Sequence, residues 1–326
     1  MSLLLPTSKP AGGDRNTFVG GTDMACLLGL SSWGNPMSVW LDKTGRSYPD
    51  QDSELLMIGR EVEPVITKLY EHRQREQGLC CYEIGPQRHN DHVWAGGSPD
   101  RIVCLPNGTA SHGLELKNIS IYAQRDRGDL SQDATELDNE TEKNWGRQGT
   151  DEIPIPYLVQ VLWYLTVTGL PYWDVAGFFY GSMLKTYRVT PDQTMADVML
   201  DVGGRFWTDH VIGGTPPDID GSKYTKYFLD RAFTAPEPGV ILKADAHTET
   251  LLSDYAYHRA CITWHGQAKD LLAHRLKNII GNAEGVQGKA GKATWKYPKE
   301  SKRKDPERVF RMTDTGDNRH ECRRVE

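Results

Sequence analysis

The sequence has little of the features that mark several common protein classes. No stretch reaches the roughly 18 apolar residues that a membrane-crossing helix needs. Residues 1–6 carry no basic segment before a long apolar core, so we do not expect a signal peptide. The six cysteines contain no CxxC pair, which argues against zinc and iron–sulfur sites. These absences predict a cytoplasmic protein with reduced thiols and no membrane association.

Motifs of three enzyme classes are also missing. The ten histidines form no HxH or HExxH pattern, which argues against zinc catalysis. The Gly-Gly-Thr stretch at 20–22 is not followed by Gly-Lys-Ser/Thr, so it is not an ATP-binding P-loop. The Ser-Pro-Asp stretch at 98–100 lacks the flanking glycines of a nucleophile elbow. A serine-hydrolase triad is therefore not indicated.

Charge is distributed unevenly along a chain whose net charge is −6. Residues 285–326 contain 12 Lys+Arg against 7 Asp+Glu, which leaves the remainder of the chain near −11. A basic tail on an acidic body fits phosphate contact by the tail. A solvated surface tail is the equally open alternative.

With 326 residues, the chain is long enough for one large domain or for one domain with a substantial appendage. We predict a core over residues 1–212, a connector over 213–243 and a C-terminal segment over 244–326. The core would contain a polar insertion near 118–152, because nine Asp+Glu lie between 126 and 152.

Hydrophobic periodicity and turn residues predict the elements. We expect helices at 24–30, with Asp23 as N-cap, and at 36–43, 53–76, 156–169, 192–211 and 244–280. Because Pro64 lacks a backbone donor, we expect a break or a bend just before it in the 53–76 helix. Short strands are predicted at 80–84, 92–96, 101–105, 113–117, 175–180 and 185–189, and two strands that could pair at 289–297 and 308–312.

Polar residues with a functional spacing occur around one predicted hairpin. Asp100 precedes the first strand, and Glu115 and Lys117 lie two apart on the second, so their side chains share one face. The turn at 106–108 would bring Asp100 and Glu115 to neighbouring strands at the same end. Each short pattern alone is more often an ordinary turn aspartate or a solvent-facing strand.

Together these side chains have the chemistry of a metal site. Asp100 and Glu115 at close range repel unless a cation neutralises them, and hard oxygen ligands favour Mg²⁺ or Mn²⁺. Lys117 beside the metal can stabilise a developing hydroxide or phosphate oxygens. Glu63 on the preceding helix can add a third carboxylate. Gln160 on a later helix can orient water or phosphate, unless it is a solvent-facing residue.

Five stretches in this order resemble the PD-(D/E)xK nuclease superfamily, and more closely its YqaJ-type viral recombinase and lambda-exonuclease group. They are residues 19–25, 59–64, 97–100, 114–117 and 155–160, and residues 291–296 are similar to the family's late strand. The resemblance covers roughly residues 15–190. It implies a mixed β-sheet flanked by helices, an α/β (α+β) restriction-endonuclease-like core, with a C-terminal helical and β extension.

The resemblance also implies roles for the residues of the metal site. Asp100, Glu115 and the backbone carbonyl of Leu116 would bind the first of two Mg²⁺ or Mn²⁺ ions. Glu63 would help to bind a metal, and Lys117 would activate water.

A second implied feature is a pocket for a DNA 5′-phosphate. Arg15 and Thr22 occupy places comparable to the family's pocket Arg and Ser, and Ser98 would contribute. Gln160 would support the catalytic site.

The function implied is a Mg²⁺-dependent 5′→3′ exonuclease that resects linear duplex DNA ends for phage-type recombination, in a bacterial or phage-infected cytoplasm. The 3′ strand would pass to a single-strand annealing protein, and a homotrimeric ring around DNA would explain processivity. An endonuclease of the same fold and a non-catalytic DNA-binding module are the alternatives. The intact Asp100, Glu115 and Lys117 argue against the second alternative.

Tryptophans are a further source of DNA contacts. Trp145 in the polar insertion could stack on a base, although a role as a loop anchor is equally compatible. For Trp33 and Trp40 we expect a place in the core.

Overall fold

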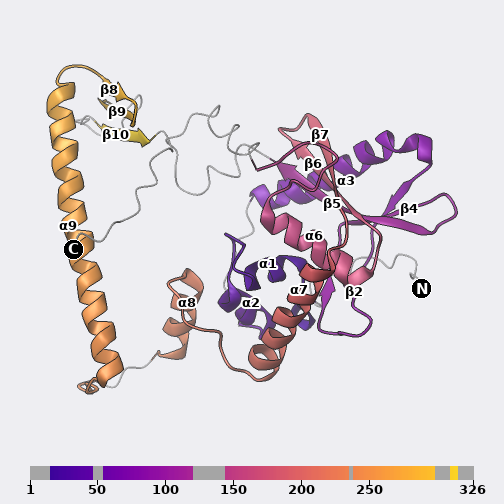
Figure 1. The fold of residues 1–326 in the computed structure, drawn as a ribbon, viewed down its shortest axis with the longest axis horizontal. Helices are drawn as coiled ribbons and strands as arrows, with labels where there is room; N and C mark the ends of the chain where they lie inside the picture. The colour runs from indigo at the N-terminus through magenta and orange to yellow at the C-terminus, as the bar shows by residue number, and fades with distance from the viewer. Residues whose placement is uncertain (1–14, 47–53, 120–143, 235–237, 298–308, 315–326) are drawn as a thin grey trace. The chain divides into compact units, whose positions relative to one another are not determined.

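The computed structural model describes residues 15–46, 54–119, 144–234, 238–297 and 309–314 (Figure 1). The chain forms two compact units, Met1–Pro236 and Glu237–Glu326. Most of the predicted acidic insertion and much of the predicted basic tail lie outside the described residues. Each unit is considered by itself below.

A five-stranded mixed sheet forms the centre of the first unit. Its strand order is β1 (Cys80–Tyr82), β4 (Arg101–Cys104), β5 (Ala110–Ile119), β6 (Trp173–Phe179) and β7 (Met183–Val189). β5 and β6 pair in parallel, and the other neighbours pair antiparallel. Parallel neighbours need a crossover, and the chain between β5 and β6 contains α6 (Ile155–Thr168). A separate ribbon is formed by β2 (Gln87–Arg88) and β3 (Gly96–Gly97).

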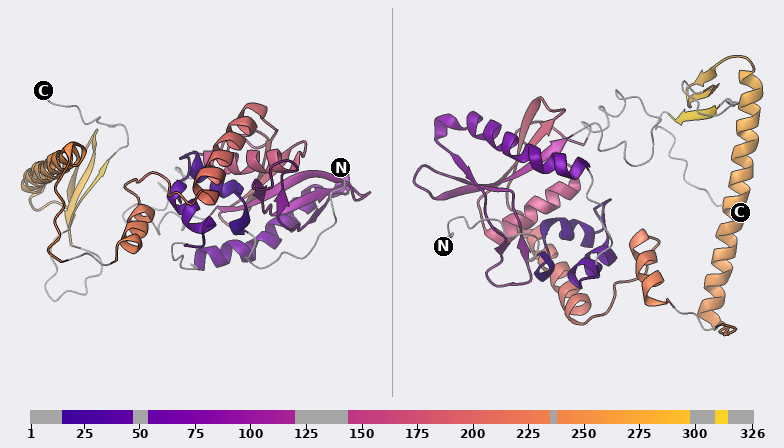
Figure 2. Two further views of the ribbon diagram at one scale, coloured as in Figure 1. Left: turned by 90° about the horizontal axis from the view of Figure 1, so that it is seen from below. Right: turned by 180° about the vertical axis from the view of Figure 1, so that it is seen from behind.

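Helices cover both faces of this sheet (Figures 1 and 2). α3 (Glu54–Arg73) packs on one face, where Leu114 and Leu116 of β5 join its apolar cluster. The opposite face carries α6, which packs against α1 (Gly21–Leu27) and α7 (Gln193–Phe206). The predicted fold class, a mixed sheet flanked by helices, is confirmed.

The starts of the first two helices show one wrong and one confirmed prediction. α1 begins at Gly21, so Asp23 is not its N-cap. Asp23 lies inside the first turn, where its carboxylate accepts a hydrogen bond of 2.7 Å from the N–H of Gly20. A carboxylate there satisfies a free backbone donor as well as a side-chain cap would. α2 (Pro36–Lys43) begins and ends as predicted, with Asn35 as its N-cap.

Of the break or bend expected just before Pro64, the break does not occur. α3 continues from Glu54 to Arg73 with Pro64 inside it. Proline removes one backbone donor from a helix, and Pro64 lies on the exposed side, where water can hydrate the carbonyl that lost its partner. Packing of Ile66 and Tyr70 against the sheet stabilises the helix beyond this point.

A polar network is buried between α3 and the sheet. Asp174 of β6 is fully buried and accepts two hydrogen bonds from Arg188, of 2.8 and 2.9 Å. The Tyr70 hydroxyl donates to Asp174 over 2.7 Å and lies 2.8 Å from Nε2 of His112. Ser111 Oγ lies 3.0 Å from Nδ1 of that histidine. The network fixes the strand ends next to the site described below.

His112 should make the stability of this unit depend on pH. Burial lowers the pKa of His112 from 6.5 to about 4. Above pH 6.5 the ring is neutral in both the folded and the unfolded chain, but between pH 6.5 and 4 only the unfolded chain binds the proton. His112 should therefore contribute about 2 kcal/mol less to the free energy of unfolding at pH 5 than at pH 7.5. Urea titrations at both pH values measure this difference. It is read as the change in pH dependence between the wild type and His112→Gln, and an identical pH dependence in the two proteins would contradict the assignment.

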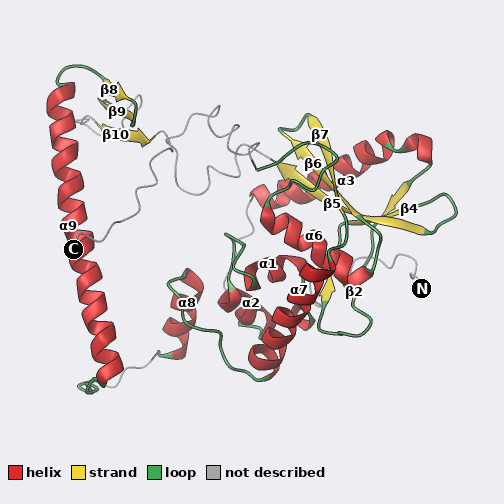
Figure 3. Cartoon of the chain, in the orientation of Figure 1, coloured by secondary structure: helices red, strands yellow, loops and turns green. Residues whose placement is uncertain are grey.

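The second unit combines one long helix with a small antiparallel sheet (Figure 3). α9 spans Ala246–Ile280, close to the predicted 244–280, and β9 (Gly291–Lys296) pairs with β10 (Val309–Asp314) as expected. β8 (Gly285–Gly288) pairs on the other side of β9 and was not predicted. Its four residues include two glycines and give little strand signal.

The predicted connector contains a helix. α8 (Lys223–Ala232) lies within residues 213–243 and packs against α2, and both helices belong to the first unit.

Within the described residues, no helix has both the length and the apolar character that a membrane crossing requires.

Candidate active site

The predicted hairpin forms and aligns Asp100 with Glu115. β4 and β5 pair antiparallel, with Arg101 opposite Leu114, so the residue before Arg101 lies beside the residue after Leu114. The carboxylate of Asp100 accepts a hydrogen bond of 2.9 Å from the N–H of Leu116. This bond anchors the Asp100 side chain to the edge of β5 where β4 no longer pairs.

Glu115 is the centre of a hydrogen-bond network under α6. Its Oε1 accepts from Lys117 Nζ over 2.7 Å and from Gln160 Nε2 over 2.9 Å. Lys117 Nζ also donates to Gln160 Oε1 over 3.2 Å. Glu115 is 2% exposed and Gln160 is 9% exposed. The solvent-facing alternative for Gln160 is therefore excluded, and three predicted site residues are in direct contact.

The pKa values of Glu115 and Lys117 show that negative charge outweighs positive charge in this network. Burial, and then the neighbouring charge of Asp100, raise the pKa of Glu115 to about 7. For Lys117, burial alone would lower the pKa, but the charges of Glu115 and Asp100 raise it overall. A positive charge bound near Glu115 would relieve the carboxylate repulsion.

A divalent cation fits the donor groups at this place. Oε2 of Glu115 is buried and has no hydrogen-bond partner, which is costly for a carboxylate oxygen without a cation. The N–H and C=O of one strand residue point to the same side, so the Leu116 carbonyl faces the edge that holds Asp100. The Glu115 carboxylate and the Leu116 carbonyl supply the oxygen ligands that Mg²⁺ and Mn²⁺ prefer.

Glu63, the third predicted carboxylate ligand, lies close to Arg101. Its carboxylate is 4.0 Å from a guanidinium nitrogen of Arg101, and its charge contributes to the raised pKa of Glu115. Among the described residues, no group of three Asp, Glu, His or Cys side chains is arranged to hold a metal. Metal binding by Glu63 stays a prediction.

The predicted 5′-phosphate residues lie around the same network. The Arg15 charge opposes the rise in pKa of Tyr164. The Tyr164 hydroxyl lies 3.1 Å from Gln160 Nε2 and 3.4 Å from the carbonyl of Ser98. Thr22 is exposed in the first turn of α1. A shared role in phosphate binding stays a prediction.

A glycine sets the position of that first turn. A Cβ on Gly21 would lie 2.9 Å from both the side chain and the carbonyl oxygen of Gln160. Only a residue without a side chain allows α1 to approach α6 this closely. The Gly-Gly-Thr motif therefore positions Thr22 relative to Gln160.

Comparison with known proteins decides the family. The family model described as the YqaJ-like viral recombinase domain matches residues 13–171. Residues 13–171 are a YqaJ-like viral recombinase domain. The uncharacterized protein YqaJ of Bacillus subtilis (strain 168) is 26% identical over 280 residues, which is 82% of this chain and 79% of that protein. All site residues predicted from the sequence lie within the matched segment.

Two solved exonuclease structures are distantly similar. An alkaline exonuclease (LHK-Exo) from Laribacter hongkongensis has 13% sequence identity and a TM-score of 0.43, covering 68% of this chain and 95% of its own. A phage-related exonuclease from Haemophilus somnus 129PT has 10% identity and a TM-score of 0.39, covering 61% of this chain and 96% of its own.

Two residues of the YqaJ-like domain's site were missed by the sequence analysis. Tyr164 is buried and bonds to Gln160, from which it is one helical turn removed, and this i, i+4 spacing was the available signal. Arg101 is 5% exposed and pairs with Glu83 over 3.1 Å. A charged residue at the start of an apolar strand, directly after Asp100, could have indicated it.

The tryptophan predictions are partly wrong. Trp145 is only 7% exposed and packs on Phe179 and Tyr187, so it is a loop anchor. Trp40 is in the core at 2% exposure, as predicted. Trp33, expected in the core, is 48% exposed because the loop between α1 and α2 carries it at the surface.

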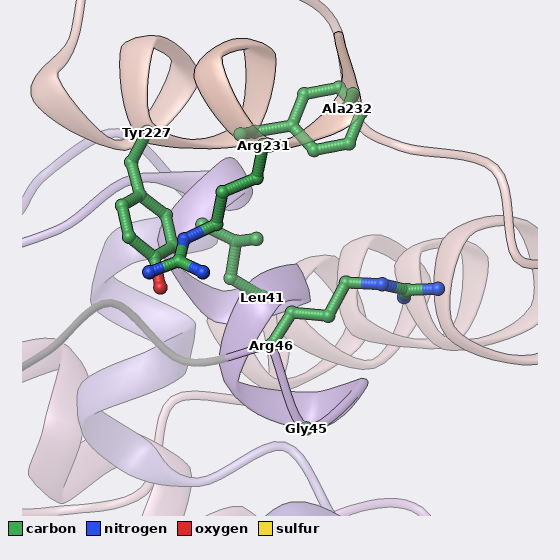
Figure 4. A pocket seen from close by; sticks show the side chains of 7 residues that line it. Leu41, Gly45, Arg46, Tyr227, Arg231 and Ala232 are labelled. Atoms are coloured by element: carbon green, nitrogen blue, oxygen red, sulfur yellow. The ribbon is translucent and has the colours of Figure 1, made fainter. Parts of the chain in front are cut away.

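A pocket of about 560 Å³ lies away from the carboxylates, between the end of α2 and α8 (Figure 4). Leu41 and Tyr227 line it, and Arg46 and Arg231 extend in different directions. Its lining residues include no Asp, Glu or His. The pocket therefore lacks the carboxylates and imidazoles that would hold a metal.

Proposed function

We propose that this protein is a Mg²⁺- or Mn²⁺-dependent deoxyribonuclease that hydrolyses DNA phosphodiester bonds. The single observation that carries the proposal is the buried, unpartnered Oε2 of Glu115 in a network with Lys117 and Gln160, beside Asp100. Pure DNA binding does not need two adjacent carboxylates, because they repel the phosphate backbone. The YqaJ-like viral recombinase domain agrees with DNA as the substrate.

Each residue has a physical role in this proposal. Asp100, Glu115 and the Leu116 carbonyl hold one or two divalent cations. When bound, such a cation polarises a phosphate oxygen and lowers the pKa of its water. Lys117 Nζ activates water or stabilises the negative charge that develops on the attacked phosphate. The amide of Gln160 fixes Glu115 and Lys117 in one geometry and leaves their remaining atoms for substrate and cation.

The finer proposal is a 5′→3′ exonuclease that acts on linear duplex ends during phage-type recombination. It is supported by the viral recombinase domain and by the contacts of Tyr164, which senses the Arg15 charge and lies close to the carbonyl of Ser98. A single-strand annealing protein would receive the 3′ strand, and a trimeric ring would explain processivity.

One plasmid digestion tests the proposal. The plasmid is supplied with Mg²⁺ as a closed circle and as a linear duplex with 5′-phosphate or 5′-hydroxyl ends, beside an EDTA control. We expect loss of the linear forms only, fastest with 5′-phosphate, and none with EDTA. Cutting of the circle would assign an endonuclease. No cleavage of any form, with Mn²⁺ also tried, would reject the nuclease.

A further inference from the structure

An aromatic column extends from the catalytic lysine to the protein surface. Lys117 Nζ lies 4.7 Å from the ring centroid of Tyr157 in the first turn of α6. On that ring stacks the indole of Trp33, with centroids 5.6 Å apart and planes at 26°. Trp145 lies against the same tyrosine, with centroids 5.8 Å apart. Trp33 is the exposed end of the column.

The backbone at Trp33 is held in place although the residue is exposed. Its backbone N–H donates to Ser31 Oγ over 3.1 Å, and its carbonyl accepts from the Tyr224 hydroxyl over 2.6 Å. The next residue, Gly34, packs so closely that a Cβ would lie 2.7 Å from Ser38 Oγ. The backbone of this loop (residues 28–35, between α1 and α2 in Figure 1) is therefore tied to α2 and α8.

We propose that Trp33 is a stacking platform for an unpaired nucleobase of the DNA strand whose phosphate lies at Lys117. This inference rests on the proposed nuclease function. One part of the indole lies against Tyr157, and Trp33 as a whole residue is 48% exposed. Aromatic side chains bind bases through such faces without regard to sequence.

Charge and distance identify an unpaired base as the occupant. The loop over residues 28–35 contains no Asp or Glu, so it does not repel a phosphate chain. Trp33 is no farther from Lys117 Nζ than the two centroid distances of the column together, a separation that a phosphate and a base of a nearby nucleotide in the same strand can span. A base inside a duplex has both faces covered by its neighbours, whereas an unpaired base has a free face.

The test compares loss of the Trp33 side chain with loss of single bases from the substrate. We would measure kcat and KM on 5′-phosphorylated linear duplexes that carry a single abasic nucleotide at each of the first few positions from the 5′ end. Trp33→Ala should raise KM about 5- to 150-fold on intact DNA, with kcat little changed. At one position, base removal should raise KM of the wild type by a similar factor and leave Trp33→Ala unaffected.

Controls separate this inference from a structural role and from the proposed function. Trp33→Phe should keep most of the affinity, because phenylalanine also stacks. Trp264→Ala, at an exposed tryptophan on α9, should behave as wild type. Wild-type cleavage with an unchanged KM in Trp33→Ala, or equal losses at all abasic positions in both proteins, would overturn the platform. Absence of wild-type cleavage would instead reject the nuclease, and anisotropy with a single-stranded oligonucleotide in EDTA would then show whether Trp33→Ala still weakens binding.

Discussion

Replacement of Lys117 by alanine is expected to lower the rate of DNA cleavage by roughly 10²- to 10⁴-fold, the usual scale for a positioned proton-transfer group. The reason is the position of this lysine. Its Nζ lies 2.7 Å from Glu115 and 3.2 Å from Gln160, within the network to which we assign the reaction. Single-turnover cleavage of linear duplex DNA in Mg²⁺ measures the effect.

Two further variants make the Lys117 result decisive. Lys117→Gln keeps a donor for the buried carboxylate and removes the ionisable amine, so a matching loss in a folded Lys117→Gln protein assigns the effect to the amine and not to the lost hydrogen bond. Lys68→Ala removes an exposed lysine from α3, on the other side of the sheet, and should cleave like the wild type. Near-normal cleavage by Lys117→Ala would remove this lysine from the mechanism.

Asp100→Ala should abolish most metal-dependent cleavage, by at least about 10²-fold, and retain DNA binding. The bound cation supplies several kcal/mol of transition-state stabilisation, and Asp100 is anchored to the Leu116 N–H for that purpose. Cleavage in a Mg²⁺ and Mn²⁺ titration and filter binding of the same duplex give the two readouts.

Thermal unfolding provides a readout for Asp100 that does not depend on activity. Ligand that binds only the folded protein stabilises it, so Mn²⁺ should raise the melting temperature of the wild type and less so that of Asp100→Ala. Asp91→Ala, at an exposed aspartate, is the matched control and should respond like the wild type. Loss of folding in Asp100→Ala without added metal would favour a structural role for this residue.

The placement of residues on strand faces was predictable from the sequence. The two-residue period of a strand puts Glu115 and Lys117 on one face whatever surrounds them, and the turn at 106–108 joins the two strands of the hairpin that brings in Asp100. The family motifs in the 13–171 segment also come from sequence alone, because their order does not depend on packing.

Several local signals were overridden by the tertiary structure. Pro64 interrupts a helix in isolation, but apolar packing on the sheet continues α3 through it. The β5 strand reads as half exposed because its residues alternate, yet α6 covers the polar face and leaves Glu115 2% exposed. Burial by a distant segment has no local sequence pattern.

The sequence by itself determined the secondary structure around the site, the pairing of Asp100 with Glu115 and the viral recombinase domain. Only the tertiary structure decided that Glu115 is buried with a free oxygen, that Tyr164 joins Gln160 to the Ser98 turn, and that Trp33 and not Trp145 is exposed. The physical reason is that hydrogen-bond partners and exposure depend on which segments meet across the sheet, whereas periodicity and turn chemistry act within a few residues of each other.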